Sequence, residues 1–193
     1  MLRQTPVCGS RGSSLIEVLV TLIILAIGLL GVAGLQAKMG AAEVESYQRE
    51  QALLALADMM DRLKANSAQA ASYVTPTPLG TGDGQPADCS GQPVGVNLDE
   101  CQWSHLLQGY SEQTATGHVG AMQSARGCIT QTQALNQTPG FCAAGIYQVT
   151  VVWQGTTATS APTNVCAQGQ YGNDAYRRAV AGTVTFPATS CLP

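Results

Sequence analysis

An uninterrupted apolar run near the N-terminus is the strongest pattern in the chain. Residues 18–37 carry no charge and lie between Glu17 and Lys38. At about 1.5 Å per residue, a helix of this length spans about 30 Å, the thickness of a bilayer's hydrocarbon core. The run exceeds the apolar part of a secretory signal peptide, about 7–15 residues, and it is apolar all round, unlike a buried soluble helix with a polar face. The pattern predicts a membrane-spanning helix, with a signal peptide cleaved near residues 33–37 as the alternative.

The helical pattern continues beyond the apolar run as an amphipathic segment. From residue 38 to residue 71 there is no proline and only one glycine, Gly40. Apolar residues recur at helical spacing among charged ones, at Leu53, Leu56, Ala57, Met60 and Leu63. We expect one helix of about 60 residues, about 90 Å long, from residue 13 to about residue 72, ended by Pro76 and Pro78. The stripe is expected to pack against the chain's own globular domain.

The remainder of the chain reads as a small α+β domain. Residues 76–97 contain four prolines and five glycines and predict a loop. Residues 99–109 predict a short helix, and residues 128–131 are expected to begin a sheet. Two strands are predicted at 146–154 and 177–186 from their β-branched and aromatic residues, with a long connection between them. We expect an antiparallel sheet packed on the amphipathic half of the helix, with Arg177 and Arg178 solvated at the start of the last strand.

Composition and charge exclude several classes of protein. Hydrophobic residues make up 45% and charged residues 11%, against about 25% charged in an ordinary soluble domain. The formal net charge of −3 excludes direct binding of nucleic acid through a general basic surface. Abundant aliphatic residues with so little charge also argue against intrinsic disorder.

Charges and cysteines flanking the apolar run predict its orientation. Arg3 and Arg11 are the only charges before Glu17, so the N-terminus is expected in the cytoplasm and the rest of the chain across the membrane. Six cysteines follow the run: Cys89, Cys101, Cys128, Cys142, Cys166 and Cys191. In an oxidising compartment they predict three disulfides, whose pairing the sequence leaves open. Neighbours close the shortest loops, so we expect pairs 89–101, 128–142 and 166–191.

Candidate chemistry outside the apolar run is weak. The glycines of residues 80–84 are neither preceded by a strand nor followed by the Lys-Ser/Thr of a phosphate-binding loop. His105 and His118 could join cysteines around zinc, but no C-x-x-C or H-x-x-x-H spacing occurs. Neither histidine is accompanied by a nucleophile motif. We therefore expect no metal, no cofactor and no catalytic residues.

The residues around Glu17 resemble a known signal. A carboxylate at the mouth of an apolar helix is costly and is usually paired or functional, a hydrated interfacial side chain being the alternative. Residues 11–20 (RGSSLIEVLV) resemble the N-terminal signal of type IV prepilins and pseudopilins. In that family the prepilin peptidase cuts after a glycine, the new N-terminus is methylated, and the fifth mature residue is glutamate. The resemblance implies a cut between Gly12 and Ser13, methylation of Ser13, loss of Cys8, and a role for Glu17 in subunit assembly.

The resemblance implies a domain organisation and a set of partners. Residues 1–12 would be the cleaved leader, 13–37 the membrane and assembly half of a helical spine, 38–75 its amphipathic half, and 76–193 a periplasmic or extracellular head. The fold class would be the type IV pilin-like α+β fold, a long N-terminal helix on an antiparallel sheet with disulfides. The implied partners are prepilin peptidase, other minor and major pilins, the inner-membrane assembly platform and an adhesin at the fibre tip.

Within the family, residues 24–31 and 34–36 resemble the PilV-like minor pilins. This implies a structural subunit that is first held in the inner membrane by a single span and then enters the pilus. It would take part in pilus assembly and priming, twitching motility and adhesion. The alternatives are a pseudopilin of the type II secretion piston and a membrane-anchored periplasmic binding protein or enzyme.

Overall fold

The computed structural model describes residues 14–109, 113–114, 117–118, 122–138 and 140–189. Gly12 and Ser13, where the cut is expected, lie outside these residues, as do Cys8 and Cys191. The chain divides into two compact units, Met1–Glu43 and Val44–Pro193.

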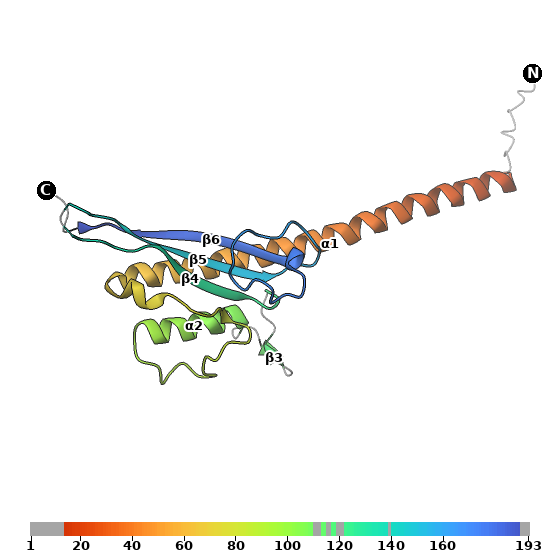
Figure 1. The fold of residues 1–193 in the computed structure, drawn as a ribbon. Helices are drawn as coiled ribbons and strands as arrows, with labels where there is room; N and C mark the ends of the chain where they lie inside the picture. Colours follow the sequence, from red (N-terminus) through yellow and green to blue (C-terminus); the bar gives the residue numbers. More distant parts are fainter. Residues whose placement is uncertain (1–13, 110–112, 115–116, 119–121, 139, 190–193) are drawn as a thin grey trace, which may run out of the picture. The chain divides into compact units, whose positions relative to one another are not determined.

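The described elements follow the predicted order of a long helix and then a mixed domain (Figure 1). The helices are α1 (Leu15–Ala65), the 3-10 helix η1 (Ser67–Tyr73), α2 (Val96–Gln108) and the 3-10 turn η2 (Asp174–Tyr176). The strands are β1 (Leu79–Gly80), β2 (Gln113–Thr114), β3 (Gly117–His118), β4 (Arg126–Gln133), β5 (Gly145–Gln154) and β6 (Arg177–Phe186). The predicted short helix and the two predicted strands are confirmed, the helix beginning three residues earlier than expected.

One antiparallel sheet organises the second unit. Its strand order is β1-β4-β5-β6, and β2 pairs separately with β3. In the centre of the sheet Val149 of β5 lies opposite Ile129 of β4 and Gly182 of β6. Side chains alternate between the two faces of a strand, so Val149 and Val151 point into the core, where residues of α1 are buried with them. The α+β fold is pilin-like, as expected.

The face of α1 that meets this core differs from the predicted stripe. Leu56 and Leu63 are buried and Met60 is half-buried, but Leu53 is 47% exposed and Ala57 is exposed too. The buried face is instead completed by Ala52, Ala55 and Met59. Close approach explains the difference, because a Cβ on Gly182 of β6 would lie 2.5 Å from the Met60 sulfur. A helix this near a sheet places small residues at the contact, whereas hydrophobicity alone favours leucine.

The long helix ends earlier than the expected residue 72. It stops at Ala65, and the following turn, η1, contains Gln69 with non-helical torsions of φ −111° and ψ 17°. The Asn66 side chain at the break donates hydrogen bonds to the Tyr73 hydroxyl at 2.7 Å and to Asp99 at 3.1 Å. These tertiary bonds change the chain direction at a point where no proline or glycine marks it.

Two disulfides join described cysteines. Cys89 pairs with Cys101, as expected. Cys128, however, pairs with Cys166, so the expected pairs 128–142 and 166–191 are wrong. The register of the sheet gives the reason: Cys128 lies opposite Thr150, eight residues along the chain from Cys142. At about 3.3 Å per extended residue, that separation far exceeds the Cα distance of a disulfide, about 4.4–6.8 Å. Cys142 is itself disulfide-bonded.

A glycine in β4 leaves room for the central aromatic residue of the core. Trp103 of α2 is fully buried, and its indole N–H donates a hydrogen bond to the Ala55 carbonyl of α1 at 2.8 Å. A Cβ on Gly127 would lie 2.1 Å from the Trp103 ring. No atom can approach so closely, so the ring would have to move and its bond to α1 would be strained.

We therefore expect Gly127→Ala to lower the free energy of unfolding by about 1–3 kcal/mol, the range for overpacking a core. Urea unfolding of the detergent-solubilised chain, followed by near-UV circular dichroism, measures this. Gly84→Ala is the matched control, because a Cβ there meets nothing within 4 Å. Equal stability of the two variants would contradict the packing argument.

Candidate membrane-assembly site

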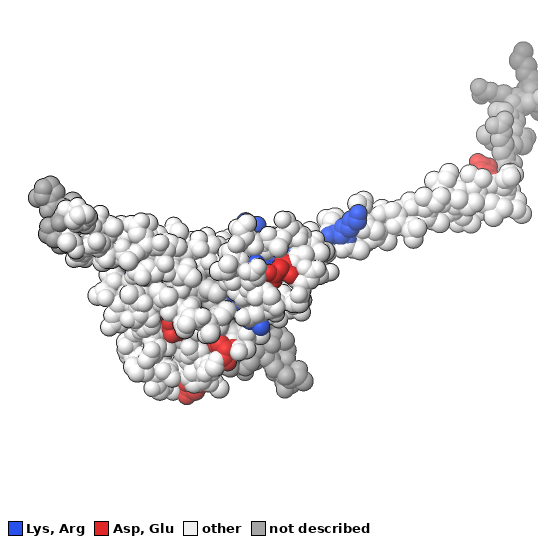
Figure 2. Space-filling model, in the orientation of Figure 1, with Lys and Arg blue, Asp and Glu red and all other residues white. Residues whose placement is uncertain are grey.

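The first half of α1 is an apolar helix surface that its own unit does not cover. One helix among the described residues is long and apolar enough to cross a membrane, with a mean hydropathy of 2.8 over its best window and none of that window buried. Large side chains such as Leu15 and Leu30 are 79% and 78% exposed. Figure 2 shows few charged atoms along the visible face of this stretch. Such a surface needs lipid or other protein chains around it.

Glu17 lies in the first turn of this helix. The backbone N–H groups of Glu17 and Val18 both donate to the Ser14 carbonyl, at 3.0 and 3.3 Å. The first N–H groups of a helix lack intrahelical partners and carry partial positive charge, so an acidic side chain in the first turn is favourable there. Glu17 is exposed. The structure thus places its carboxylate beside the helix N-terminus, and its role in subunit assembly stays a prediction.

The apolar half of α1 remains a continuous helix although it contains threonine and glycine, which are weak helix formers. The Thr21 hydroxyl donates to the Val18 carbonyl at 2.8 Å, which satisfies it inside the apolar run. Gly28, Gly31 and Gly34 lie within continuous helix, and a Cβ on any of them would meet nothing within 4 Å. Contacts within the described chain therefore give no packing reason for glycine at these positions.

In the second unit, Asp99 connects α2 to the end of α1. Arg62 of α1 donates to Asp99 at 2.9 Å and to Asp58 one turn back, also at 2.9 Å. The Tyr73 hydroxyl donates to the other Asp99 oxygen. Burial of Tyr73, together with the Asp99 carboxylate, raises the pKa of the phenol to about 12. Tyr73 therefore stays protonated and keeps donating this bond at physiological pH.

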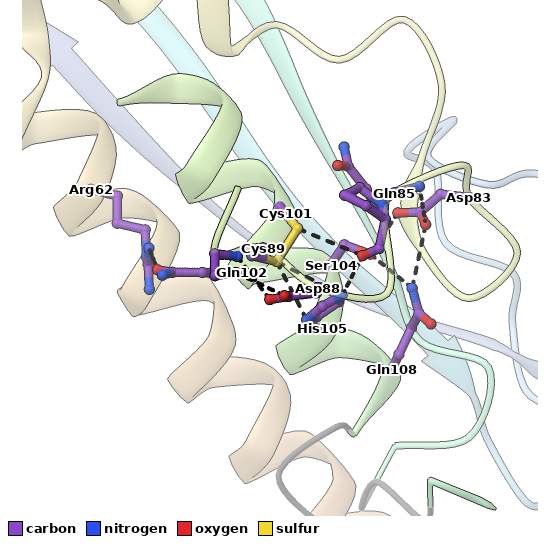
Figure 3. The surroundings of a disulfide bond; sticks show 12 residues. Arg62, Asp83, Gln85, Asp88, Cys89, Cys101, Gln102, Ser104, His105 and Gln108 are labelled. Atoms are coloured by element: carbon purple, nitrogen blue, oxygen red, sulfur yellow. Dashed lines mark hydrogen bonds between the residues drawn. A yellow bond between two sulfur atoms is a disulfide. The ribbon is translucent and has the colours of Figure 1, made fainter. Parts of the chain in front are cut away.

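The structure brings His105 against the Cys89–Cys101 disulfide, which the sequence did not predict (Figure 3). The Cys89 sulfur lies 3.4 Å from Nδ1 of His105, and Nε2 lies 2.8 Å from the Pro86 carbonyl. The signal available in the sequence was the separation of four residues between Cys101 and His105, which places both on one helix face. Zinc binds thiolates, whereas the sulfurs of Cys89 and Cys101 are joined in a disulfide, so in this state neither is a thiolate that could bind zinc.

The glycine loop at residues 80–84 is closed by its own carboxylate. Asp83 accepts hydrogen bonds from the backbone N–H groups of Gly80 at 2.7 Å and Gln85 at 3.2 Å. The Ser104 hydroxyl donates to the same side chain at 2.6 Å. Asp83 thus takes the position that a bound anion would occupy, and Ser104 is bonded to an acid rather than to a histidine. The side chain of His118 lies outside the described residues.

The two arginines at the start of β6 are not solvated, contrary to expectation. Arg177 is 1% exposed and donates to the carbonyls of Asn164, Cys166 and Pro162 at 2.8, 3.1 and 3.1 Å. Arg178 forms an ion pair with Glu45 of α1. A guanidinium has five N–H donors in a planar fork, so it can replace its hydration shell with loop carbonyls. The loop that supplies these carbonyls precedes β6 directly, but the bonds span 11–15 residues and follow from how the loop folds back, which a local pattern does not show.

Comparison with known proteins identifies the N-terminal signal alone. Residues 8–33 match the family model described as the prokaryotic N-terminal methylation motif. No curated protein and no solved structure matches the chain. The motif indicates a type IV pilin-like or pseudopilin protein, and it implies processing by prepilin peptidase and association with pilins and a membrane assembly machinery. The pilin-like fold agrees with a structural rather than enzymatic protein anchored in a membrane.

Glu100 of α2 makes the stability of the second unit depend on pH. Burial raises the pKa of its carboxyl from 4.5 to about 7. Folding therefore favours the protonated acid, and stability falls as pH rises from the unfolded pKa through the folded one. Glutamine cannot ionise. We therefore expect Glu100→Gln to have the same unfolding temperature as the wild type at about pH 4 and a higher one than the wild type at about pH 8. Thermal unfolding at both pH values measures this, and an equal difference at both would contradict it.

Proposed function

We propose that this chain is a minor pilin, a structural subunit that takes part in type IV pilus assembly and priming. The observation that carries the proposal is the coincidence of the methylation motif at residues 8–33 with an exposed apolar helix beginning at Leu15. The motif supplies a processing signal, and the helix supplies a surface that suits lipid before assembly and neighbouring helices afterwards. The pilin-like α+β fold of residues 44–193 supports the same reading.

Assembly in this proposal depends on a charge pair in an otherwise apolar core. Cleavage after Gly12 exposes the α-amine of Ser13, and Glu17 lies four residues further along, at the start of α1. In a fibre core the Glu17 carboxylate of one subunit pairs with the amine of its neighbour, giving register to an apolar seam. Removing one partner of a buried pair costs roughly 3–5 kcal/mol, because the other charge stays buried and uncompensated.

The finer role is that of a PilV-like minor pilin that acts in fibre priming, with consequences for twitching motility and adhesion. Arg3 and Arg11 keep the N-terminus in the cytoplasm, so the head is periplasmic until the subunit enters the pilus. A disulfide-rich head suits an extracellular fibre. A pseudopilin of the secretion piston shares the same signal and is the second candidate.

Processing is tested by N-terminal sequencing and intact mass of the chain from a host with prepilin peptidase. We expect the mature chain to begin at a methylated Ser13. Gly12→Val is expected to leave the leader attached, since the peptidase needs this glycine. Gly9→Val, in the same leader, is the control and is expected to be processed. A wild-type chain beginning at Met1 would remove the pilin proposal.

Assembly is tested by quantifying variants in membranes and in sheared surface fibres. Glu17→Gln keeps the size of the side chain and removes its charge, so we expect normal membrane insertion and a loss from fibres of at least tenfold. Glu50→Gln, an exposed glutamate on the same helix, is the control and is expected in normal amounts. Wild-type protein that is processed but absent from sheared fibres would favour the secretion piston over the pilus.

A further inference from the structure

A cavity of about 370 Å³ lies on the face of the sheet turned away from α1. Its floor consists of Cys128 and Thr130 of β4 with Gln148 and Thr150 of β5. These residues alternate with Ile129, Val149 and Val151, which point into the core, so the two sets occupy opposite faces. Residues 75–78 form one wall and residues 163–167 the other.

Both walls are fixed to the sheet by bonds that a flexible loop would lack. The Thr75 N–H donates to the Ile129 carbonyl at 3.0 Å, and the Ile129 N–H donates to the Thr75 hydroxyl oxygen at 2.9 Å. The opposite wall is joined to the floor by the Cys128–Cys166 disulfide. Arg177 donates to carbonyls of that wall from behind. A cavity with walls held in this way is preformed, so a ligand would lose little free energy in ordering it.

Polar groups on the floor and wall have hydrogen-bonding capacity to spare. Thr150 is 3% exposed, and its hydroxyl has no hydrogen-bond partner among the described residues. Asn164 accepts a bond from Arg177 at its Oδ1, which fixes the amide and leaves its Nδ2 group without a partner in the described part of the chain. Hydroxyl and carboxamide groups placed in this way can hydrogen-bond to a ligand that enters the cavity.

The cavity lining carries no charged side chain. Arg177 lies behind the wall, and its Nε is 3.5 Å from the Asp174 carboxylate. An ionic ligand would lose hydration here without gaining an ion pair. Threonine hydroxyls and carboxamides both donate and accept, which matches a ligand rich in hydroxyl groups. Pro76, Pro78 and Val165 add apolar surface for the C–H faces of a ring.

We propose that this cavity binds an uncharged, hydroxyl-rich ligand, one or two sugar rings of a neutral glycan. Its volume lies at the small end of ligand pockets, about 300–1,000 Å³. The proposal goes beyond subunit assembly and does not depend on it, because every lining residue belongs to the unit Val44–Pro193. A failure of this proposal would leave the proposed function untouched.

The test uses the full chain in detergent with its disulfides intact. Maltose, lactose and N,N′-diacetylchitobiose are titrated as neutral probes and digalacturonate as an acidic probe, with binding followed by saturation-transfer NMR and calorimetry. We expect saturable binding of at least one neutral probe and weaker binding of the acidic one. Thr150→Val removes a hydroxyl at nearly constant shape, and we expect it to weaken binding about five- to tenfold.

Gln148→Met is the second floor variant and is expected to weaken binding to a similar extent. Thr185→Val is the matched control, because Thr185 is exposed on β6 and lies outside the cavity, and we expect unchanged affinity. Unfolding temperatures of all variants separate lost binding from lost fold. The absence of binding by every neutral probe, stronger binding of digalacturonate, or equal affinity of Thr150→Val and wild type would each overturn the proposal.

Discussion

The second unit depends on the burial of one face of α1 against the antiparallel sheet. That face is built from Ala52, Ala55, Leu56, Met59 and Leu63, which share a single core with β4, β5 and β6. Small residues bring the helix close to the strands, and the large Trp103 from α2 then fills the space above Gly127. Each choice constrains the next, because a closely packed interior leaves no volume for an added methyl group. The same helix is apolar and exposed over its first half. One continuous element therefore presents an uncovered apolar surface in its first half and a core-packing face in its second.

Local patterns predicted the elements of this fold, and tertiary contacts decided where the predictions failed. The β-branched and aromatic residues of 146–154 and 177–186 identified β5 and β6, and the apolar run identified the N-terminal half of α1. The break after Ala65 arises from bonds that Asn66 makes to Tyr73 and Asp99. A local sequence pattern cannot predict the contact with Asp99, because Asp99 lies 33 residues from Asn66 along the chain. The disulfide pairing failed for the same reason, because the hairpin register sets which cysteines can meet.

The connection between β5 and β6 illustrates how a loop acquires a fixed shape without a hydrophobic core of its own. Its carbonyls accept hydrogen bonds from the buried Arg177, and Cys166 ties it to β4. Burying a guanidinium is costly, and these bonds offset the cost only if the loop follows one path. A sequence reading places an arginine at the start of a strand in water by default. In this protein the buried Arg177 instead holds the loop that forms one wall of the cavity on the polar face of the sheet.

The N-terminal signal and the second unit differ in how far the sequence alone identifies them. The N-terminal signal consists of a glycine, a carboxylate and an apolar run in linear order, so residues 8–33 match the methylation-motif family model by sequence alone. The second unit contains a core, disulfides and a loop whose carbonyls accept hydrogen bonds, features that many different sequences can supply. Its specific chemistry therefore has to be derived from geometry. The uncharged cavity beside the Cys128–Cys166 disulfide is such a feature, because its floor of threonine and glutamine side chains lies on the face of the sheet opposite the hydrophobic core and becomes visible only once the strand register is known.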